Sequence, residues 1–468
     1  MRKLLLVLGE VFLQLVTGGV LFILVSRLAG PELFGEYSLV LAWILLFQGI
    51  AGFGIPEFIL RETGIRSSGG DRYAYHGLII GFLTSAVAMA IMLVVSVVLD
   101  YPEHVKAALR VGTLALIPMM INYLCRAGFL ARRQVGFIFC IAFVESLIIM
   151  GFSTWLLLTD AGVVPLVATV CGAKAVSSVL SLFWFNRHAL SLRQRFDWTF
   201  CKTLLRPILA FGVSNGLGML ALRVNTIMLS FWATMSEVGH YAAAAKILDV
   251  ALIMPSLCAQ LVMPRVAYAF AQQNRHRLVL FEKAFHAIFA AAMPLGVGAV
   301  FYADVLVAML FGPAFDEAVL PLRILMIYYL IEVADVLMGV VLKSARQENL
   351  DVRLFAINPA LNVVFNLVAI PALGGTGAAI AKLAGVLASS VSRYVAISRN
   401  LAAMRWLDFA GRPLIISVTV GFALQTIGSA LSGPVSIALF AALTMAGLAW
   451  TAQFSRADLT EILRPPSQ

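Results

Sequence analysis

The chain has 468 residues, of which 61% are hydrophobic and only 12% are charged, and its formal net charge is +10. A soluble domain of this length cannot hide so much apolar surface in one core, so the composition excludes a soluble enzyme and predicts a membrane protein. The basic residues are dispersed among short connections without interleaved aromatic residues. This pattern indicates membrane topology and contact with anionic inner-leaflet lipid, not nucleic-acid binding.

Apolar stretches predict about fourteen transmembrane helices, because about 20 residues at roughly 1.5 Å each cross the hydrocarbon layer. The first six are expected at 4–29, 38–55, 77–99, 107–130, 137–159 and 163–185. The next six are expected at 207–232, 240–268, 284–310, 318–342, 354–373 and 377–398, and the last two at 413–431 and 435–454. The first helix is too long for a secretory signal and is expected to be retained.

Lysine and arginine fall mostly on alternate connections, and the opposite connections carry acidic residues such as Glu32, Asp100, Glu237 and Asp304. The side that is rich in basic residues is normally cytoplasmic. Both termini are therefore expected in the cytoplasm. Arg126 and Arg393 are counted among the cytoplasmic cations in this interpretation.

Weak internal similarity predicts two six-helix lobes of the same orientation. The segment FGEY at Phe34–Tyr37 is similar to VGHY at Val238–Tyr241, and later matches keep their order along both halves. Two copies with an even number of spans should be related by a pseudo-two-fold axis along the membrane normal. The expected parts are an N-lobe at 1–190, a cytoplasmic linker at 191–206, a C-lobe at 207–401 and an accessory helix hairpin with a cytoplasmic tail at 402–468.

Several basic residues fall inside the predicted spans, where a charge at the helix centre costs about 2.5 kcal/mol or more unless water or protein surrounds it. The functional interpretation is a cationic cavity between two lobes that binds an anionic group such as a phosphate. The alternatives are snorkelling to the surface and, for Arg223, a structural pair with Asp249. The predicted substrate-binding cations are Arg223, Lys246, Lys174 and Lys382.

Five carboxylates inside spans could bind a driving H⁺ or Na⁺, or could instead neutralise nearby cations. The predicted ion-coupling residues are Asp249, Glu145, Glu10, Glu332 and Asp335. Asn358, Asn362 and Asn366 are spaced four residues apart, so they share one helix face that lines the cavity or forms interhelical hydrogen bonds.

No motif in the sequence predicts catalysis, a resident cofactor or a metal site. The GGTG segment at Gly374–Gly377 lacks the lysine that follows in a phosphate-binding loop, and it predicts a tight turn instead. The six histidines and five cysteines show no metal-ligand spacing. Most connections are too short to form a catalytic domain. Any chemistry is therefore expected to take place within the helices.

The chain resembles the multidrug/oligosaccharidyl-lipid/polysaccharide (MOP) exporter superfamily, in particular its polysaccharide-transport branch of Wzx-type flippases. The resemblance rests on three segments, which are SRLAGPELFGEYSLVLA at Ser26–Ala42, GFGIPEFILRE at Gly52–Glu62 and LRVNTIMLSFWATMSEVGHYAAAAKI at Leu222–Ile247. It implies two lobes packed as a V around a cavity that opens alternately to each side.

The resemblance also implies a function. The expected substrate is an undecaprenyl-pyrophosphate-linked oligosaccharide, moved from the inner to the outer leaflet of a bacterial cytoplasmic membrane during surface polysaccharide assembly. Membrane lipids, a polysaccharide polymerase and glycosyltransferases are the implied partners. In this branch the seventh helix commonly reads arginine, one residue, aspartate, whereas this chain has Arg223, Val224 and Asn225. Asn225 thus replaces one coupling candidate and is counted with the substrate-binding residues.

Three alternatives stay open at this point. The first is multidrug or lipid II export within the same superfamily. Cationic drugs would favour a cavity dominated by carboxylates, whereas this chain has more basic residues inside its predicted spans. The second is a membrane glycosyltransferase or polymerase, which usually has long outer loops that this sequence lacks. The third is a scaffold that organises a polysaccharide synthesis complex without transport.

Overall fold

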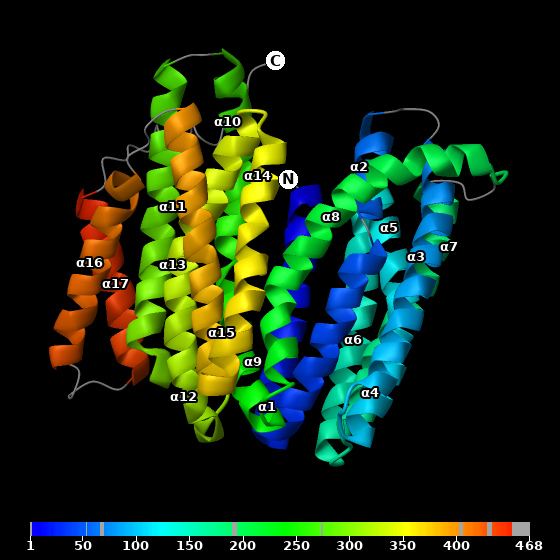
Figure 1. The fold of residues 1–468 in the computed structure, drawn as a ribbon, viewed down its shortest axis with the longest axis horizontal. Coiled ribbons are helices and arrows are strands. Elements are labelled where there is room, and N and C mark those ends of the chain that lie inside the picture. The colour runs from blue at the N-terminus through cyan, green and yellow to red at the C-terminus, as the bar shows by residue number, and fades with distance from the viewer. Residues whose placement is uncertain are drawn as a thin grey trace. The chain divides into compact units, whose positions relative to one another are not determined.

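The structure is a computed structural model that describes residues 2–52, 54–65, 70–189, 194–272, 275–401, 406–427 and 433–451. Within these ranges all regular secondary structure is helical, as the composition predicted (Figure 1). The helices are α1 (Arg2–Gly52), α2 (Ile55–Ile65), α3 (Gly70–Val98), α4 (Glu103–Thr113), α5 (Leu116–Ala131), α6 (Val135–Leu158), α7 (Val163–Trp184), η1 (Phe185–Ala189), α8 (Trp198–Leu229), α9 (Met235–Ala251), α10 (Ile253–Gln272), α11 (Arg275–Phe301), α12 (Ala303–Leu310), η2 (Pro313–Ala318), α13 (Val319–Ser344), α14 (Glu348–Phe355), α15 (Ile357–Asn400), α16 (Trp406–Ile427) and α17 (Gly433–Thr451).

The two longest helices, α1 and α15, are each broken at one glycine. Gly30 in α1 has φ 74° and Gly374 in α15 has φ 54°, a left-handed conformation that glycine adopts without a steric penalty. Each of these helices therefore contains two of the predicted spans. The predicted turn at Gly374–Gly377 is confirmed by this break.

Eight helices among the described residues are long and apolar enough to cross a membrane, or nine if the bent pair Phe285–Phe301 and Ala303–Leu310 counts as one span. Apolar side chains cover their outer faces; on α3, for example, Val94, Val97 and Val98 are exposed. Exposed apolar faces are what contact with lipid tails requires. The protein is therefore a multi-pass membrane protein, and the number of fourteen spans stays a prediction.

By its internal contacts the chain divides into two compact units, Met1–Gly239 and His240–Gln468. In the first unit, α1 packs along α6 and α8, while α5 packs on α3 and α7. The core of this unit includes the buried side chains of Phe129, Phe185 and Ile208. The helix α8 thus belongs to the first unit, although it begins inside the predicted linker and continues into the predicted C-lobe. A lobe boundary at 191–206 stays a prediction.

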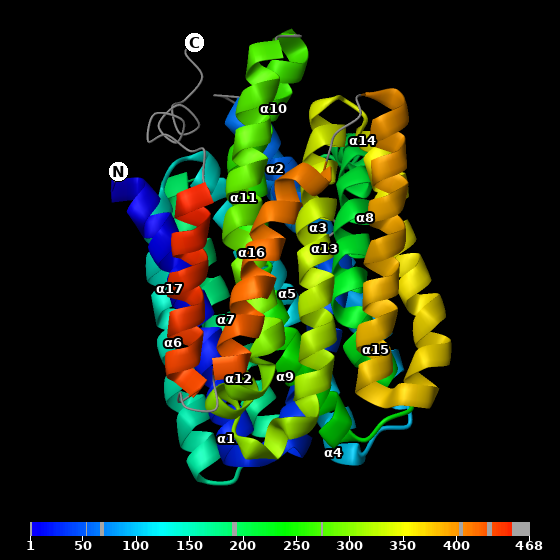
Figure 2. The same cartoon turned by 90° about the vertical axis from the view of Figure 1, so that its left-hand side faces the viewer.

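In the second unit, α13 packs on α10, α11 and α15. The last two helices, α16 and α17, lie side by side against α11 (Figure 2). Edge-to-face aromatic pairs fix them there, with ring centroids 5.1 Å apart for Phe301 and Phe422 and 5.8 Å apart for Tyr302 and Phe440. The predicted accessory hairpin therefore has a packed apolar interface.

The two glycines of the repeated segment, Gly35 and Gly239, allow two backbones of the first unit to meet. A Cβ atom added to Gly35 would lie 1.9 Å from the backbone oxygen of Met235, and one added to Gly239 would lie 2.0 Å from that of Pro31. These contacting atoms belong to the backbone, so they cannot relieve the overlap by a change of rotamer as a side chain can. Only glycine fits at either position.

Replacing Gly35 with alanine should therefore lower the free energy of unfolding by about 3 kcal/mol or more, at the upper end of the range for overpacking. Gly151→Ala on α6 is the matched control, because nothing lies within 4 Å of its added Cβ atom. This control should be neutral or stabilising by about 0.5 to 1 kcal/mol. Thermal unfolding in detergent compares the two, and equal melting temperatures would contradict the close approach.

Asp197, which lies in the predicted linker directly before α8, forms hydrogen bonds and an ion pair with residues of α3. Asp197 caps α8, because its Oδ1 accepts a hydrogen bond of 3.1 Å from the backbone N–H of Phe200. Its Oδ2 lies 2.5 Å from Nη2 of Arg72. Its own backbone N–H donates to Nε2 of the buried His76, whose Nδ1 lies 2.7 Å from the carbonyl oxygen of Arg72. Since a carbonyl can only accept and an N–H can only donate, His76 is neutral and carries its proton on Nδ1.

The Phe200 hydrogen bond and the Arg72 guanidinium hold the pKa of Asp197 below its usual value of 3.8. The resulting stabilisation is present above the usual pKa and is lost as the pH falls through the lowered pKa. Asp197→Asn keeps the cap but cannot titrate. Wild type should therefore lose more thermal stability than Asp197→Asn between about pH 6 and about pH 2. If wild type and Asp197→Asn lost the same melting temperature over this pH range, the result would contradict a stabilising role for the Asp197 carboxylate.

Candidate functional site

A polar cavity of about 220 Å³ lies inside the first unit, among α1, α5, α6 and α7. Its polar wall has two basic and two acidic side chains, together with amide and hydroxyl groups. The lining residues are Glu10, Gln14, Met119, Asn122, Tyr123, Arg126, Phe129, Ile138, Ile141, Ala142, Glu145, Lys174 and Ser181. The cavity therefore brings together three predicted site residues, Glu10, Glu145 and Lys174.

Glu10 and Arg126 form one ion pair of the cavity. Nε of Arg126 donates to Oε1 of Glu10 at 3.2 Å, and Nη2 donates to Oε2 at 3.0 Å. The side chain of Glu10 is only 2% exposed, whereas that of Arg126 is 39% exposed. A two-bond pair of this kind is strong and directional. It satisfies the buried carboxylate and leaves part of the guanidinium open to the cavity.

Lys174 and Glu145 form the second ion pair. Nζ of Lys174 lies 2.5 Å from Oε1 of Glu145, and the two side chains are 23% and 13% exposed. The pair joins α7 to α6, and the first pair joins α5 to α1. In each pair the cation is the more exposed partner, so both positive charges remain reachable from the cavity.

Asn122 connects the two cation-bearing helices. Its Nδ2 donates to Oγ of Ser177 at 2.8 Å, and its Oδ1 accepts from Oγ of Ser181 at 2.8 Å. Helical spacing explains the arrangement, because Asn122 and Arg126 are four residues apart on α5, and Lys174, Ser177 and Ser181 follow one face of α7. The hydrogen bonds of Asn122 therefore fix Arg126 and Lys174 relative to each other.

The arrangement suits reversible binding of an anionic or hydroxyl-rich group. The two ion pairs make the wall neutral as it stands. An entering phosphate can accept hydrogen bonds from Arg126 and Lys174 in place of the carboxylates, because guanidinium and ammonium groups bind phosphates as well as carboxylates. Sugar hydroxyl groups can bond to the amides of Gln14 and Asn122.

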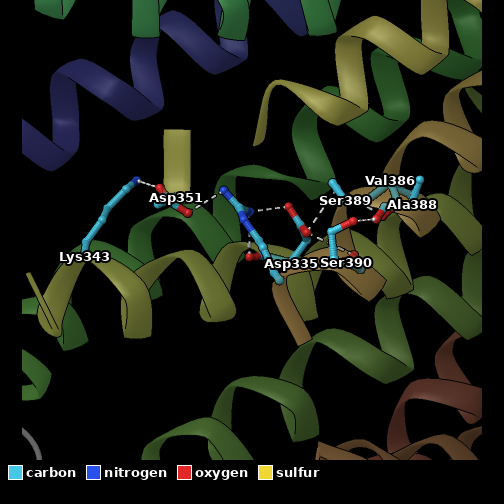
Figure 3. A network of polar contacts seen from close by, with 9 residues as sticks. Asp335, Lys343, Asp351, Val386, Ala388, Ser389 and Ser390 are labelled. Carbon is cyan, nitrogen blue, oxygen red and sulfur yellow. Dashed lines mark hydrogen bonds and ion pairs between the residues drawn. The ribbon is translucent and has the colours of Figure 1, made fainter. Parts of the chain in front are cut away.

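The second unit contains a buried charged network on α13, α14 and α15 (Figure 3). Arg393, whose side chain is 4% exposed, donates from Nη1 to the carboxylate and backbone oxygen of Asp335. Its Nη2 donates to Oδ1 of Asp351 at 2.6 Å. The hydroxyl groups of Ser389 and Ser390 donate to Oδ1 of Asp335, at 3.1 and 3.0 Å. The predicted coupling residue Asp335 is thus held by three donors.

Asp351 has a second cationic partner. Nζ of Lys343, a half-exposed side chain, lies 3.5 Å from its Oδ2. The network therefore contains two carboxylates and two cations, and its charges balance. It ties α14 to the facing parts of α13 and α15.

Further predicted residues of the second unit lie on α13 and α15, and Glu332 on α13 is half-buried. Lys382 is 3% exposed, and its Nζ lies 5.2 Å from the ring centroid of Tyr328. Asn358, Asn362 and Asn366 are all buried, and Asn366 donates to Asn362 at 3.2 Å. A Cβ atom added to Gly385 would lie 2.7 Å from Oδ1 of Asn358, so the side chain of Asn358 faces the second half of α15. A substrate-binding role for the lysine and the asparagines, and a coupling role for Glu332, stay predictions.

The remaining predicted residues lie on α8 and α9. Arg223 is half-buried on α8, and Asn225 beside it is 1% exposed. Lys246 and Asp249 are half-buried on α9. Their roles in binding and coupling stay predictions.

Sequence analysis missed the two arginines that organise these sites. Arg126 and Arg393 were counted with the cytoplasmic cations, but Arg126 lies within α5 beside the cavity and Arg393 is buried in α15. Both residues fall inside spans that the sequence predicted, at 107–130 and 377–398. A basic residue inside a predicted span was the signal available for each.

The helical fold and the apolar outer faces define a multi-pass membrane protein, and its first unit contains a charged cavity. A family model described as polysaccharide biosynthesis protein matches residues 24–320. The chain belongs to this family, as its resemblance to a polysaccharide-transport branch predicted. The relatives and solved structures that it resembles are flippases and transporters.

One curated relative is similar in sequence. It is the probable low-salt glycan biosynthesis flippase Agl15 of Haloferax volcanii, 21% identical over 206 residues, which cover 42% of this chain. The match spans 43% of the length of that relative.

Solved structures share the fold. The lipid II flippase MurJ in an inward closed conformation matches with a TM-score of 0.79 at 10% identity, over 98% of this chain and all of that one. An inward-facing multidrug resistance MATE family transporter of the MOP superfamily matches with a TM-score of 0.67 at 16% identity, over 84% and 96% of the two chains. A MOP superfamily transporter from Pyrococcus furiosus Vc1, described as having a binding pocket of reverse polarity, matches with a TM-score of 0.59 at 16% identity, over 84% and 92%.

Proposed function

We propose that the protein is a flippase for lipid-linked oligosaccharides, which moves an undecaprenyl-pyrophosphate-linked glycan from the inner to the outer leaflet. Membership in the polysaccharide biosynthesis family and the fold shared with a lipid II flippase support this function. The similarity to a glycan biosynthesis flippase supports a glycan as cargo. The proposed setting is surface polysaccharide assembly in a bacterial cytoplasmic membrane, beside a polymerase and glycosyltransferases.

The observation that carries the proposal is the pair of reachable cations in the first unit. Arg126 and Lys174 line one polar cavity, and each is more exposed than its carboxylate partner. A pyrophosphate offers several oxygens to such a pair, and arginine binds them in a two-bond geometry. The glycan would occupy hydrated space and the prenyl tail would remain in lipid.

The ion pairs provide a way to couple cargo to a driving cation. When the pyrophosphate takes the place of Glu10 and Glu145, each released carboxylate is left without its partner, and binding H⁺ or Na⁺ neutralises it. In this proposal the two lobes rock in alternating access, with both termini in the cytoplasm. Arg223, Lys246, Lys382, Asn225, Asn358, Asn362 and Asn366 complete the substrate contacts, and Asp249, Glu332 and Asp335 are the further coupling carboxylates.

A flipping assay tests the function directly. Purified protein in vesicles is given a fluorescent undecaprenyl-pyrophosphate oligosaccharide, under separate H⁺ and Na⁺ gradients. Wild type should flip it, and Arg126→Gln with Lys174→Gln should reduce the rate at least about tenfold, which is about 1.4 kcal/mol of binding or barrier. Arg132→Gln, which changes an exposed arginine just beyond α5, should flip normally. Normal flipping by the double variant would reject the cavity as the binding site.

Lipid II export is the second candidate, since the lipid II flippase fold covers nearly the whole chain. The same vesicles loaded with lipid II separate the two candidates. Faster flipping of lipid II than of any tested oligosaccharide carrier would assign that substrate instead.

A further inference from the structure

The first turns of α8, at 198–206, precede the span that the sequence predicts at 207–232. They cross the end of α3 before the helix turns along its neighbours (Figure 1). Arg72, in the first turn of α3, lies with its Cζ 4.1 Å from the ring centroid of Phe200. Since the predicted span of α3 begins only at residue 77, this part of α8 lies at the level of a membrane surface.

One face of these turns is packed against the first unit. Cys201, Leu204 and Ile208 are buried in the same apolar core as Ile55 and Ile59 of α2. Their spacing of three and four residues places them on a single face of α8. The segment is therefore held on the protein by this face, and its other faces are those that can meet a partner.

A neighbouring face is apolar but uncovered. Trp198, Leu205 and Leu209, which are seven and four residues apart, share this face and are 57%, 42% and 49% exposed. Phe196, directly before the helix, is 52% exposed. Water solvates such a row of large apolar side chains poorly, and a contiguous exposed patch of this kind marks contact with a membrane or a partner.

The next face is polar. The exposed Thr199 and Thr203 lie on it, and the exposed Lys202 lies at its border with the apolar face. A helix of this kind can lie in the interfacial layer of a membrane, with its uncovered apolar side chains against acyl chains and its polar side chains among the headgroups. Trp198 suits this position, because tryptophan is enriched where one end of the ring is apolar and the other is wet.

The charge of the segment favours an anionic lipid. Arg195 and Lys202 are exposed, and Nζ of Lys202 lies 5.6 Å from the ring centroid of Trp198. Asp197 is the single acidic residue in the sequence between 194 and 209, and it is already paired with Arg72. Positive charge therefore lies beside the apolar face. An anionic phospholipid matches both features, whereas a free phosphate would leave the apolar face in water.

We propose that the segment at 195–209 is an interfacial anchor that binds anionic phospholipid. The headgroups contact Arg195 and Lys202, and the acyl chains cover the apolar face. Because Asp197 joins the same segment to Arg72 of α3, the anchor fixes the start of α8 and the end of α3 to the membrane surface together. No carrier lipid takes part, so the inference goes beyond the proposed function and does not depend on it.

Fluorescence quenching by brominated lipids tests this contact on the purified full chain, in vesicles without carrier lipid. Two preparations contain the same mixture of phosphatidylcholine and phosphatidylglycerol, with bromine on the acyl chains of one lipid or of the other. The Trp198 signal is the difference between wild type and Trp198→Phe. Each cation near an anionic surface favours binding about fivefold, so brominated phosphatidylglycerol should quench this signal with at least about fivefold higher relative affinity. Absence of quenching by either lipid would overturn the proposal.

Variants of the two cations identify the source of the preference. Arg195→Gln with Lys202→Gln should make the two lipids quench equally, whereas Arg195→Lys with Lys202→Arg should keep the preference. Arg132→Gln is the matched control, because it removes an exposed arginine just beyond α5, and it should also keep the preference.

Two results would contradict the anionic site. Equal quenching by both lipids in wild type would show an apolar contact without selection of headgroups, and an unchanged preference in Arg195→Gln with Lys202→Gln would place the selection elsewhere. If the Trp198 signal behaves as expected but vesicles flip no carrier lipid, the flippase function fails while the interfacial anchor stands.

Discussion

Replacing Arg393 with methionine is expected to lower the free energy of unfolding by about 3 to 5 kcal/mol, the range for removing one partner of a buried ion pair. The reason is that Asp335 and Asp351, with side chains 1% and 3% exposed, would both lose their guanidinium partner. Lys343 could still compensate Asp351, but it does not reach Asp335 in the described network. Denaturant unfolding in detergent, followed by circular dichroism, measures the change.

The control for this substitution is Arg353→Met, because Arg353 is an exposed arginine on α14. It should change stability by no more than about 0.5 kcal/mol, as is usual for surface positions. Combining Arg393→Met with Asp335→Asn and Asp351→Asn should recover much of the loss, since the only charge left without its partner would be that of the half-exposed Lys343. Equal unfolding free energies for Arg393→Met and Arg353→Met would show that the network contributes nothing to stability.

Replacing Arg126 with glutamine should affect both stability and transport. Glu10 would remain buried without its cationic partner, at a cost of about 2 kcal/mol, below the range for fully buried pairs because the Arg126 side chain is 39% exposed. In vesicles the flipping rate should fall at least about tenfold, because the proposed two-bond contact of Arg126 with the cargo phosphate would be lost.

The double variant Glu10→Gln with Arg126→Gln separates these two effects. It should regain most of the stability, since the buried charge is gone, but it should not regain flipping. Thermal unfolding and the vesicle assay on the same preparations provide the comparison. Recovery of flipping in the double variant would mean that Arg126 only neutralises Glu10 and does not contact the cargo.

The helical segments were predictable because apolar length and the position of glycine are local properties. The spans expected at 137–159 and 163–185 correspond to α6 and α7, which begin and end within a few residues of those limits. The break in α1 was placed less well. Its helix resumes directly after Gly30 at Pro31, whereas the sequence interpretation left a connection as far as Tyr37, because that segment is more polar than its neighbours.

The candidate site was predictable only in part. Lys174, Glu145 and Glu10 were recognised as charges inside spans, and the structure brings them to one cavity. Their pairing was not predictable, because Glu10 and Arg126 are 116 residues apart and meet only through tertiary packing. Arg393 was counted with the cytoplasmic cations, because the alternation of basic residues along the sequence does not show which neighbour compensates a charge.

The chemical asymmetry of the cavity has a mechanical consequence. The cation-bearing helices α5 and α7 are linked through Asn122, and the carboxylate-bearing helices α1 and α6 pack on each other. Because α6 also packs closely on α7, the Lys174–Glu145 pair lies within a packed helix interface. The Arg126–Glu10 pair joins α5 and α1, which contact each other less, so a small movement can open this pair without separating closely packed helices.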